Sequence, residues 1–87
     1  VITAICSLSN NNFVTGSLDT SLKIWDIRTG KILKKLNGHT HAVIMIAELS
    51  NLNIVSTSLD KTIIIWSYDG MIINTLEGFD NPVMEVV

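Results

Sequence analysis

The apolar residues of this chain fall into short runs separated by turns that are rich in Asn, Asp, Gly and Thr. No stretch carries a helical period of usable length, whereas β-branched and aromatic residues are frequent inside the runs, as is typical of strands. The pattern therefore predicts an all-β chain. We place its strands at residues 1–8, 13–17, 21–27, 31–36, 42–49, 54–58, 62–67, 71–76 and 82–87.

Two of these strands have compositions that indicate where they lie in a sheet. The run Ile63–Trp66 is apolar throughout, so we expect its strand to be covered on both faces and to be the most buried of its set. The strand at 31–36 carries three lysines instead, and lysine on an outer strand discourages pairing with another chain. We interpret Lys31, Lys34 and Lys35 as a solvated edge, with an acidic partner as the alternative.

One stretch of the sequence occurs twice. Gly16–Asp26 reads GSLDTSLKIWD, and Thr57–Ser67 reads TSLDKTIIIWS. Trp25 recurs at Trp66, a step of 66 − 25 = 41 residues, but a later Leu-x-Gly motif recurs after only 76 − 36 = 40. Turns absorb changes in length, so we place a hairpin at residues 68–70, where one residue is missing. A period of about 40 residues is typical of a solenoid, propeller or array.

With Gly38-His39 ahead of its second copy, the repeat resembles the WD-repeat family of β-propellers. The resemblance covers nearly the whole chain and rests on several residue types that agree in order and spacing. It implies two four-stranded antiparallel blades and the first strand of a third, within a larger propeller. The corresponding segments are 1–41 for the first blade and its loop, 42–81 for the second, and 82–87 for the third.

The resemblance also implies a buried network in which an indole N–H, a hydroxyl, an imidazole and a carboxylate satisfy one another. The first copy lacks its histidine, which would precede Val1. The implied members are His39, Ser56, Asp60 and Trp66 in the second copy and Thr15, Asp19 and Trp25 in the first. We interpret His39 and Asp60 as a structural pair rather than a catalytic one. His39 and His41 alone are thin support for a metal site, because no Cys or carboxylate lies close in sequence.

In the family, the face that bears the Gly-His loops and the turns before the repeated Asp is the one most used to bind partners. The positions that correspond to it here are Leu18, Leu59, Thr40, His41, Ala42, Asp80 and Asn81. An apolar residue at the same turn of two consecutive blades would form a small exposed patch. The alternative is that each leucine packs back against the neighbouring blade.

The length, charge, cysteine content and motifs of the chain make several classes of function less favourable. At 87 residues and a formal net charge of −2, the chain has no strong attraction for nucleic acid or acidic lipid. Its longest strictly apolar run, 42–47, is too short to cross a bilayer. Cys6, which we interpret as a small core residue, excludes an internal disulfide framework and fits a reducing intracellular setting, cytoplasmic or nuclear. No nucleophile elbow or phosphate loop occurs, so we expect neither enzyme activity nor a cofactor.

These observations lead to one main functional prediction and two alternatives. We expect an interaction scaffold that presents loop residues to other proteins within an assembly, with the remaining blades of the propeller as intramolecular partners. One alternative is a two-blade unit that forms a ring from several copies. Both 1–5 and 82–87 have the pattern of a first strand, so identical units would offer two candidates for each inner position. The other alternative is a propeller attached to an enzyme or to a nucleic-acid complex.

Overall fold

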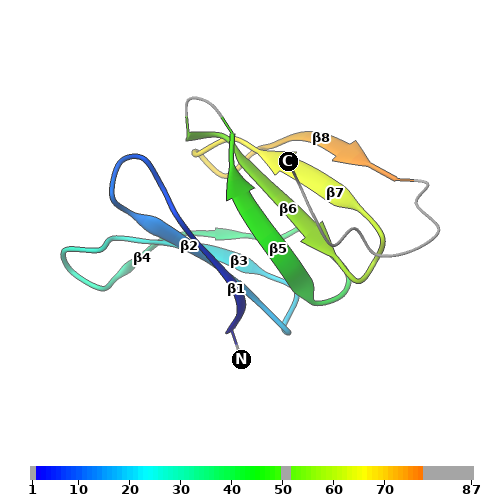
Figure 1. The fold of residues 1–87 in the computed structure, drawn as a ribbon, viewed down its shortest axis with the longest axis horizontal. Coiled ribbons are helices and arrows are strands. Elements are labelled where there is room, and N and C mark those ends of the chain that lie inside the picture. Colours follow the sequence, from blue (N-terminus) through cyan, green and yellow to red (C-terminus); the bar gives the residue numbers. More distant parts are fainter. Residues whose placement is uncertain (1, 50–51, 78–87) are drawn as a thin grey trace.

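The chain is described by a computed structural model over residues 2–49 and 52–77, and these ranges form two four-stranded antiparallel sheets (Figure 1). Within each sheet every strand pairs with the next one along the chain. The first sheet contains β1 (Ile2–Ser7), β2 (Phe13–Ser17), β3 (Leu22–Trp25) and β4 (Ile32–Leu36). The second contains β5 (Val43–Glu48), β6 (Ile54–Ser58), β7 (Ile63–Trp66) and β8 (Ile72–Leu76). All eight agree with the strands expected between residues 1 and 76, while 82–87 lies outside the described residues.

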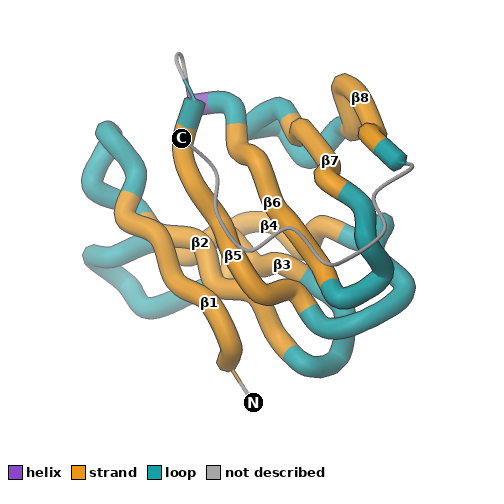
Figure 2. Tube along the Cα trace, turned by 45° about the vertical axis from the view of Figure 1, so that its right-hand side comes forward, coloured by secondary structure: helices purple, strands orange, loops and turns teal. Residues whose placement is uncertain are grey.

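The two sheets pack face to face, as propeller blades do. Figures 1 and 2 show β1 and β5 side by side, with β4 and β8 diverging at the far ends of the sheets. A single apolar core joins the sheets, and full burial of each aliphatic side chain in it is worth about 1.5–3 kcal/mol. Its members are Leu8, Val14, Leu22, Ile24, Leu36, Val43, Ile54, Ile64 and Trp66.

Glycine allows the closest approach between the sheets. A Cβ on Gly16 would lie 2.5 Å from Cγ1 of Val43, so a side chain at this position would push β5 away from β2. A Cβ on Gly38 would lie 2.9 Å from Cη2 of Trp66. Both glycines are therefore needed for contact with a neighbouring element.

The second strand of each sheet is the most buried one. The sequence had predicted that the third strand would be, so that prediction was wrong. Every residue of β6 is buried, as are the three central residues of β2, whereas buried and half-buried residues alternate along β3 and β7. β2 and β6 each lie between two paired strands, and their short side chains such as Thr15 and Ser56 are almost fully buried. Ile63 and Ile65 point to the face of the second sheet that lies away from the first sheet, and they are only half-buried.

The one-residue difference between the copies lies in the hairpin before the fourth strand, where it was expected. In the first sheet the N–H of Gly30 donates to the carbonyl of Asp26 at 2.8 Å, which closes a turn of five residues. In the second sheet the N–H of Gly70 donates to the carbonyl of Ser67 at 3.0 Å, which closes a turn of four. Both glycines have positive φ, 72° and 94°, a conformation that most other residues adopt only with strain.

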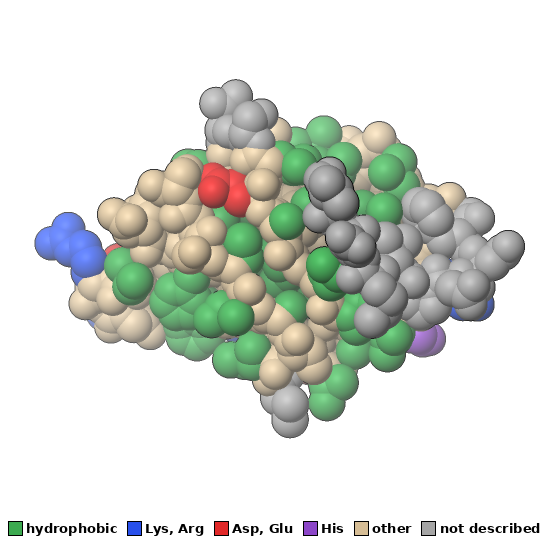
Figure 3. Space-filling model, viewed as in Figure 1, with side chains coloured by type: hydrophobic (Ala, Val, Ile, Leu, Met, Phe, Trp, Pro, Cys, Tyr) green, Lys and Arg blue, Asp and Glu red, His purple; other side chains and the backbone are tan. Residues whose placement is uncertain are grey.

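The outer strands β4 and β8 are exposed along most of their length. The three lysines expected at a solvated edge, Lys31, Lys34 and Lys35, are all exposed. β8 instead presents apolar side chains, among them Ile73 at 54% exposure. Hydrophobic side chains also reach the surface over both sheets (Figure 3).

We predict that Gly16→Ala destabilises the intact protein by about 1–3 kcal/mol, because the added methyl group overpacks the contact with Val43. Removing part of the opposing side chain should relieve the clash. The double variant Gly16→Ala, Val43→Ala is therefore expected to lose less stability than the sum of the two single variants. Chemical unfolding of all four proteins checks this, and simple additivity would contradict the proposed close contact.

Candidate functional site

The second sheet holds a buried imidazole at the point where the β4–β5 loop meets the β6–β7 turn. His39 lies in that loop and is 5% exposed, and Asp60 lies in the turn between Ser58 and Thr62. The turn is closed by the N–H of Lys61, which donates to the carbonyl of Ser58 at 3.1 Å. Oδ1 of Asp60 accepts the N–H of Thr62 at 2.9 Å and also its hydroxyl, so the carboxylate fixes its own turn.

Both ring nitrogens of His39 have partners. Nε2 lies 2.7 Å from Oγ of Ser56, and Nδ1 lies 3.1 Å from Oδ2 of Asp60. Nε1 of Trp66 donates to the same Ser56 Oγ at 2.8 Å, and the two aromatic rings meet edge to face with centroids 6.4 Å apart. The structure thus joins His39, Ser56, Asp60 and Trp66 in one hydrogen-bonded chain, which we term the His39 clasp.

The directions of these hydrogen bonds select one tautomer of His39. The indole N–H of Trp66 occupies one lone pair of the Ser56 oxygen, which leaves the hydroxyl free to donate to Nε2. Nε2 must then be unprotonated, so the ring proton lies on Nδ1. From there it donates to Asp60, a carboxylate that can only accept.

Burial lowers the pKa of His39 below its usual 6.5, although the hydrogen bond and charge of Asp60 act in the opposite direction. The ring is therefore neutral at pH 7, as the clasp requires. Because the unfolded chain binds a proton more readily than the folded one, the stability supplied by neutral His39 is complete above about pH 6.5. This contribution to stability decreases as the pH falls below about 6.5, because protonation of His39 then favours the unfolded chain.

The pKa of Asp60 is lowered to about 2. Burial alone would raise it, but this effect is outweighed by hydrogen bonds from Thr62, from the backbone N–H of Thr40 at 2.9 Å, and from His39. The carboxylate is thus ionised at any physiological pH. It holds both the loop and the turn through charge-assisted hydrogen bonds.

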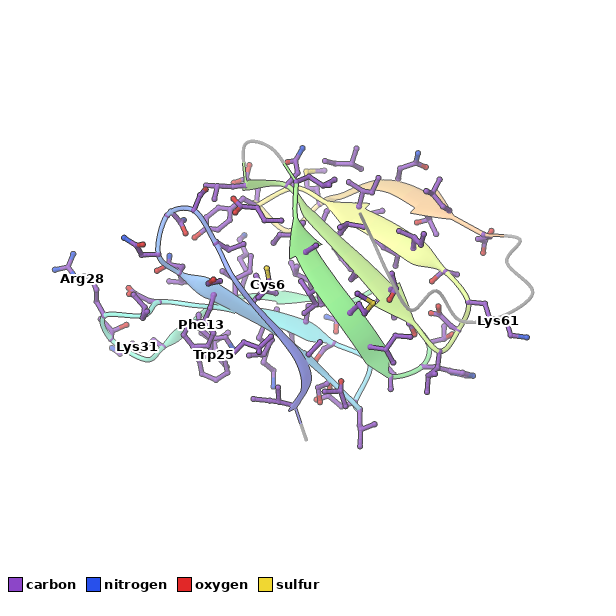
Figure 4. All side chains as sticks on the ribbon, in the orientation of Figure 1. Cys6, Phe13, Trp25, Arg28, Lys31 and Lys61 are labelled. Carbon is purple, nitrogen blue, oxygen red and sulfur yellow. The ribbon has the colours of Figure 1, made fainter. Side chains whose placement is uncertain are left out.

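The first sheet contains only part of the same arrangement. Nε1 of Trp25 donates to Oγ1 of Thr15 at 2.8 Å, and Oδ1 of Asp19 accepts the backbone N–H of Ser21 at 3.0 Å and its hydroxyl at 2.6 Å. Hydrogen bonds from Ser21 lower the pKa of Asp19 to about 2. Among the described residues no hydrogen bond links the Thr15–Trp25 pair to Asp19. Trp25 stacks on Phe13, with ring centroids 6.0 Å apart (Figure 4).

Most of the expected partner-binding positions are exposed. Leu18 and Leu59 are 55% and 46% exposed at the tips of the β2–β3 and β6–β7 turns, so neither packs back against a blade. Thr40 and His41 are exposed as well. Ala42 differs from the other positions, because it is only 8% exposed and its carbonyl accepts the N–H of Leu59 at 3.0 Å. The other two expected positions, Asp80 and Asn81, lie outside the described residues.

Three further features of the site did not follow from the sequence. The sequence analysis did not identify Thr62, although a hydroxyl two residues after the repeated Asp also occurs at Ser21 and could have indicated it.

At the end of the sheets away from the His39 clasp, Glu48 accepts the N–H of Ser9 at 3.0 Å and thereby links the two sheets. Cys6 is half-buried rather than a core residue, and burial raises its thiol pKa.

Over 2–49 and 52–77, no group of three or more His, Cys, Asp or Glu could hold a metal ion. No helix in those same ranges has the length and apolar character needed to cross a membrane.

Comparison with known proteins identifies the repeat. The family model described as "WD domain, G-beta repeat" matches residues 1–26 and 30–67. The chain is 46% identical over 44 residues to pre-mRNA-splicing factor PRP46 of Saccharomyces cerevisiae, covering 51% of this chain and 10% of that protein. It is 40% identical over 45 residues to autophagy-related protein 16 of Arabidopsis thaliana, covering 51% and 9%. It is also 40% identical over 38 residues to U3 small nucleolar RNA-associated protein 15 of Schizosaccharomyces pombe, covering 44% and 8%.

Solved structures of β-propellers superpose on this chain and agree with the family match. The WD40 β-propeller domain of Doa1 superposes with a TM-score of 0.89 at 28% identity, over 97% of this chain and 29% of that one. The structure of U3-55K superposes with a TM-score of 0.88 at 22% identity, over 94% and 28%. The chain thus spans less than a third of either solved chain and about a tenth of each curated relative.

We predict that His39→Ala lowers the free energy of unfolding of the intact protein by about 1–3 kcal/mol, because it leaves the Ser56 hydroxyl and the Asp60 carboxylate without their buried partner. His41→Ala is the matched control, since His41 is exposed two residues away and its loss should change stability by at most about 0.5 kcal/mol. Equal effects of the two substitutions in chemical unfolding would rule out a stabilising clasp.

Proposed function

This chain belongs to the WD-repeat family of β-propellers, and on that basis we propose that it is a protein–protein interaction scaffold. Propellers of this family are typically interaction modules rather than catalysts. We further propose that the binding surface is the loop face, made of the turns 17–21 and 58–62 and the loop 37–42. The observation that carries this proposal is the exposure of Leu18 and Leu59 at the same turn of two successive blades.

The geometry of the turns supports a role in binding. Leu18 and Leu59 follow the serines that open the two turns, so their side chains extend from the end of the sheet with little cover. An exposed leucine at this point adds nothing to the core, yet both copies have it. A partner that buries both side chains would gain about 25 cal/mol for each Å² of apolar surface removed from water.

The His39 clasp gives this surface a rigid base. Asp60 immediately follows Leu59, and its carboxylate accepts hydrogen bonds from His39 and from the N–H of Thr40 at 2.9 Å. The exposed groups of the turn and of the loop are thereby held relative to one another before a partner arrives. Such preorganisation reduces the entropy lost on binding.

We also propose that these blades form part of a closed propeller. Family propellers have about four to eight blades, and each blade is covered by two neighbours. Here the outer face of the first sheet leaves Ile5 67% exposed. The half-buried Ile63 and Ile65 lie on the outer face of the second. In this proposal 1–41 and 42–81 are two blades with their following loops, and 82–87 supplies the first strand of the next.

The relatives indicate the setting of the proposed scaffold. Two of the three are named for RNA processing, as a splicing factor and a nucleolar RNA-associated protein, and the third for autophagy. We propose that the protein works inside the cell as a subunit of a multiprotein assembly, with other proteins as its direct partners.

We predict that Leu18→Asp combined with Leu59→Asp reduces the recovery of co-purifying proteins about tenfold without unfolding the protein, because the loss of two apolar contacts is worth about 1–2 kcal/mol or more. Quantitative affinity purification of the intact protein from its own cells provides the measurement. Met71→Asp is the control, since Met71 is 70% exposed on the hairpin before β8, away from the loop face. An unchanged set of partners in the double variant, or an equal loss in the control, would refute the proposal.

A further inference from the structure

Positive charge is concentrated on one strand pair of the first sheet. Although the chain has a net charge of −2, five of its six Lys and Arg residues lie between positions 23 and 35. Four of these five side chains are exposed, and Lys23 is half-buried. Figure 4 shows Arg28 and Lys31 at the outer end of the first sheet, with Lys61 on the opposite side of the molecule. The cluster comprises Lys23, Arg28, Lys31, Lys34 and Lys35.

The second sheet shows that the fold does not require this charge. β8 occupies the same outer position as β4, and its sequence Ile72–Leu76 contains no charged residue. If lysines were needed only to keep outer strands from pairing, β8 would need them equally. The lysines of β4 therefore have a role that the repeat itself does not explain.

The pairing register of the first sheet makes the charges costly. Lys23 of β3 lies directly opposite Lys35 of β4, and like charges at such positions destabilise a sheet. The equivalent pair in the second sheet is Ile64 and Thr75, which carries no repulsion. The charge of Lys23 adds to the hydrogen bonds from Ser21 in lowering the pKa of Asp19, but no Lys or Arg forms an ion pair among the described residues. Lys23 and Lys35 share the outer face of the first sheet with Ile5, so an acidic group in a neighbouring blade or in a partner protein would relieve this repulsion.

The lysines lie on both faces of the same edge strand. Lys34 and Lys35 are consecutive, so their side chains point to opposite faces of the sheet. Lys34 points toward the second sheet, where its Cδ lies 3.5 Å from the position of a Cβ on Gly70. β4 is also the last strand of its sheet, so within residues 2–49 and 52–77 no strand lies beside its outer backbone N–H and C=O groups.

We propose that the outer edge of β4 binds an extended acidic segment of a partner protein, which adds to the first sheet as a fifth strand. Backbone hydrogen bonds along β4 would supply affinity, and consecutive carboxylates would alternate between the two faces to meet Lys35 and Lys34. A nucleic-acid backbone is the weaker candidate, because a row of phosphates on one side would leave one of these lysines unused. The β4 edge is separate from the loop face, so this proposal does not depend on partner binding at the loop face.

The test uses the intact protein and a labelled, end-capped peptide with four central Glu residues flanked by Thr-Val on each side. We expect saturable binding in fluorescence anisotropy at about 150 mM salt, where weak surface attraction is largely screened. Lys34→Glu with Lys35→Glu should weaken binding at least about tenfold. Lys61→Glu, at an exposed lysine outside the cluster, should leave it unchanged.

Two further probes separate strand addition from simple charge attraction. A peptide with alternate backbone nitrogens methylated keeps every carboxylate but lacks the donors for a strand, so we expect its binding to be lost. Hydrogen exchange should slow in Ile32–Leu36 when the parent peptide binds and stay unchanged in Ile72–Leu76. The proposal is overturned if the parent peptide does not bind, if the methylated peptide binds as tightly, or if an oligouridylate of similar length binds more tightly.

Discussion

The architecture around the proposed binding surface depends on one buried imidazole with a partner on each nitrogen. His39 connects the loop before β5 to the middle of β6 through Ser56 and to the β6–β7 turn through Asp60. Ser56 in turn satisfies the indole N–H of Trp66, which is 1% exposed in the core. A buried polar group without a partner costs about 1–3 kcal/mol, so each member of the His39 clasp makes the burial of the next one favourable.

The two copies of the repeat show that this arrangement needs a neighbouring element. Trp25 and Trp66 each donate to a hydroxyl of the second strand at 2.8 Å. Only Trp66 is fully buried, because it belongs to the core that joins the two sheets and Gly38 of the preceding loop packs against it. The same local sequence therefore yields a half-buried Trp25 in one sheet and a core residue in the other. Each blade is completed by contacts that its own four strands do not supply, which is the behaviour expected of a stacked repeat.

Much of the fold could be predicted from the sequence, because short runs of neighbouring residues determine the strands and turns and the same pattern occurs in both copies. Apolar runs separated by turn residues located the eight described strands, and the lost residue between the copies located the shorter hairpin at Ser67–Gly70. The members of the His39 clasp followed from the resemblance to the WD-repeat family, whose motif assigns the four roles to His39, Ser56, Asp60 and Trp66.

Other features depend on three-dimensional contacts that periodicity does not encode. Ala42 directly follows the exposed His41, yet it is buried because its backbone pairs with the β6–β7 turn. Lys23 lies opposite Lys35 only because of the register of β3 and β4, whose irregularity between Ile24 and Trp25 cannot be derived from alternation. Every residue of β6 is buried although three of its five residues are polar, so its burial does not follow from its own hydrophobicity.

The protonation of His39 is the property on which the clasp depends most directly. Two-bond ¹H–¹⁵N correlation spectra of the ¹⁵N-labelled intact protein report which ring nitrogen carries the proton. We expect a protonated Nδ1 and an unprotonated Nε2 at pH 7, and a titration midpoint below 6.5, because burial lowers the pKa of this ring. A proton on Nε2, or a ring that titrates at its ordinary pKa of about 6.5, would contradict the buried hydrogen-bond chain from Trp66 to Asp60.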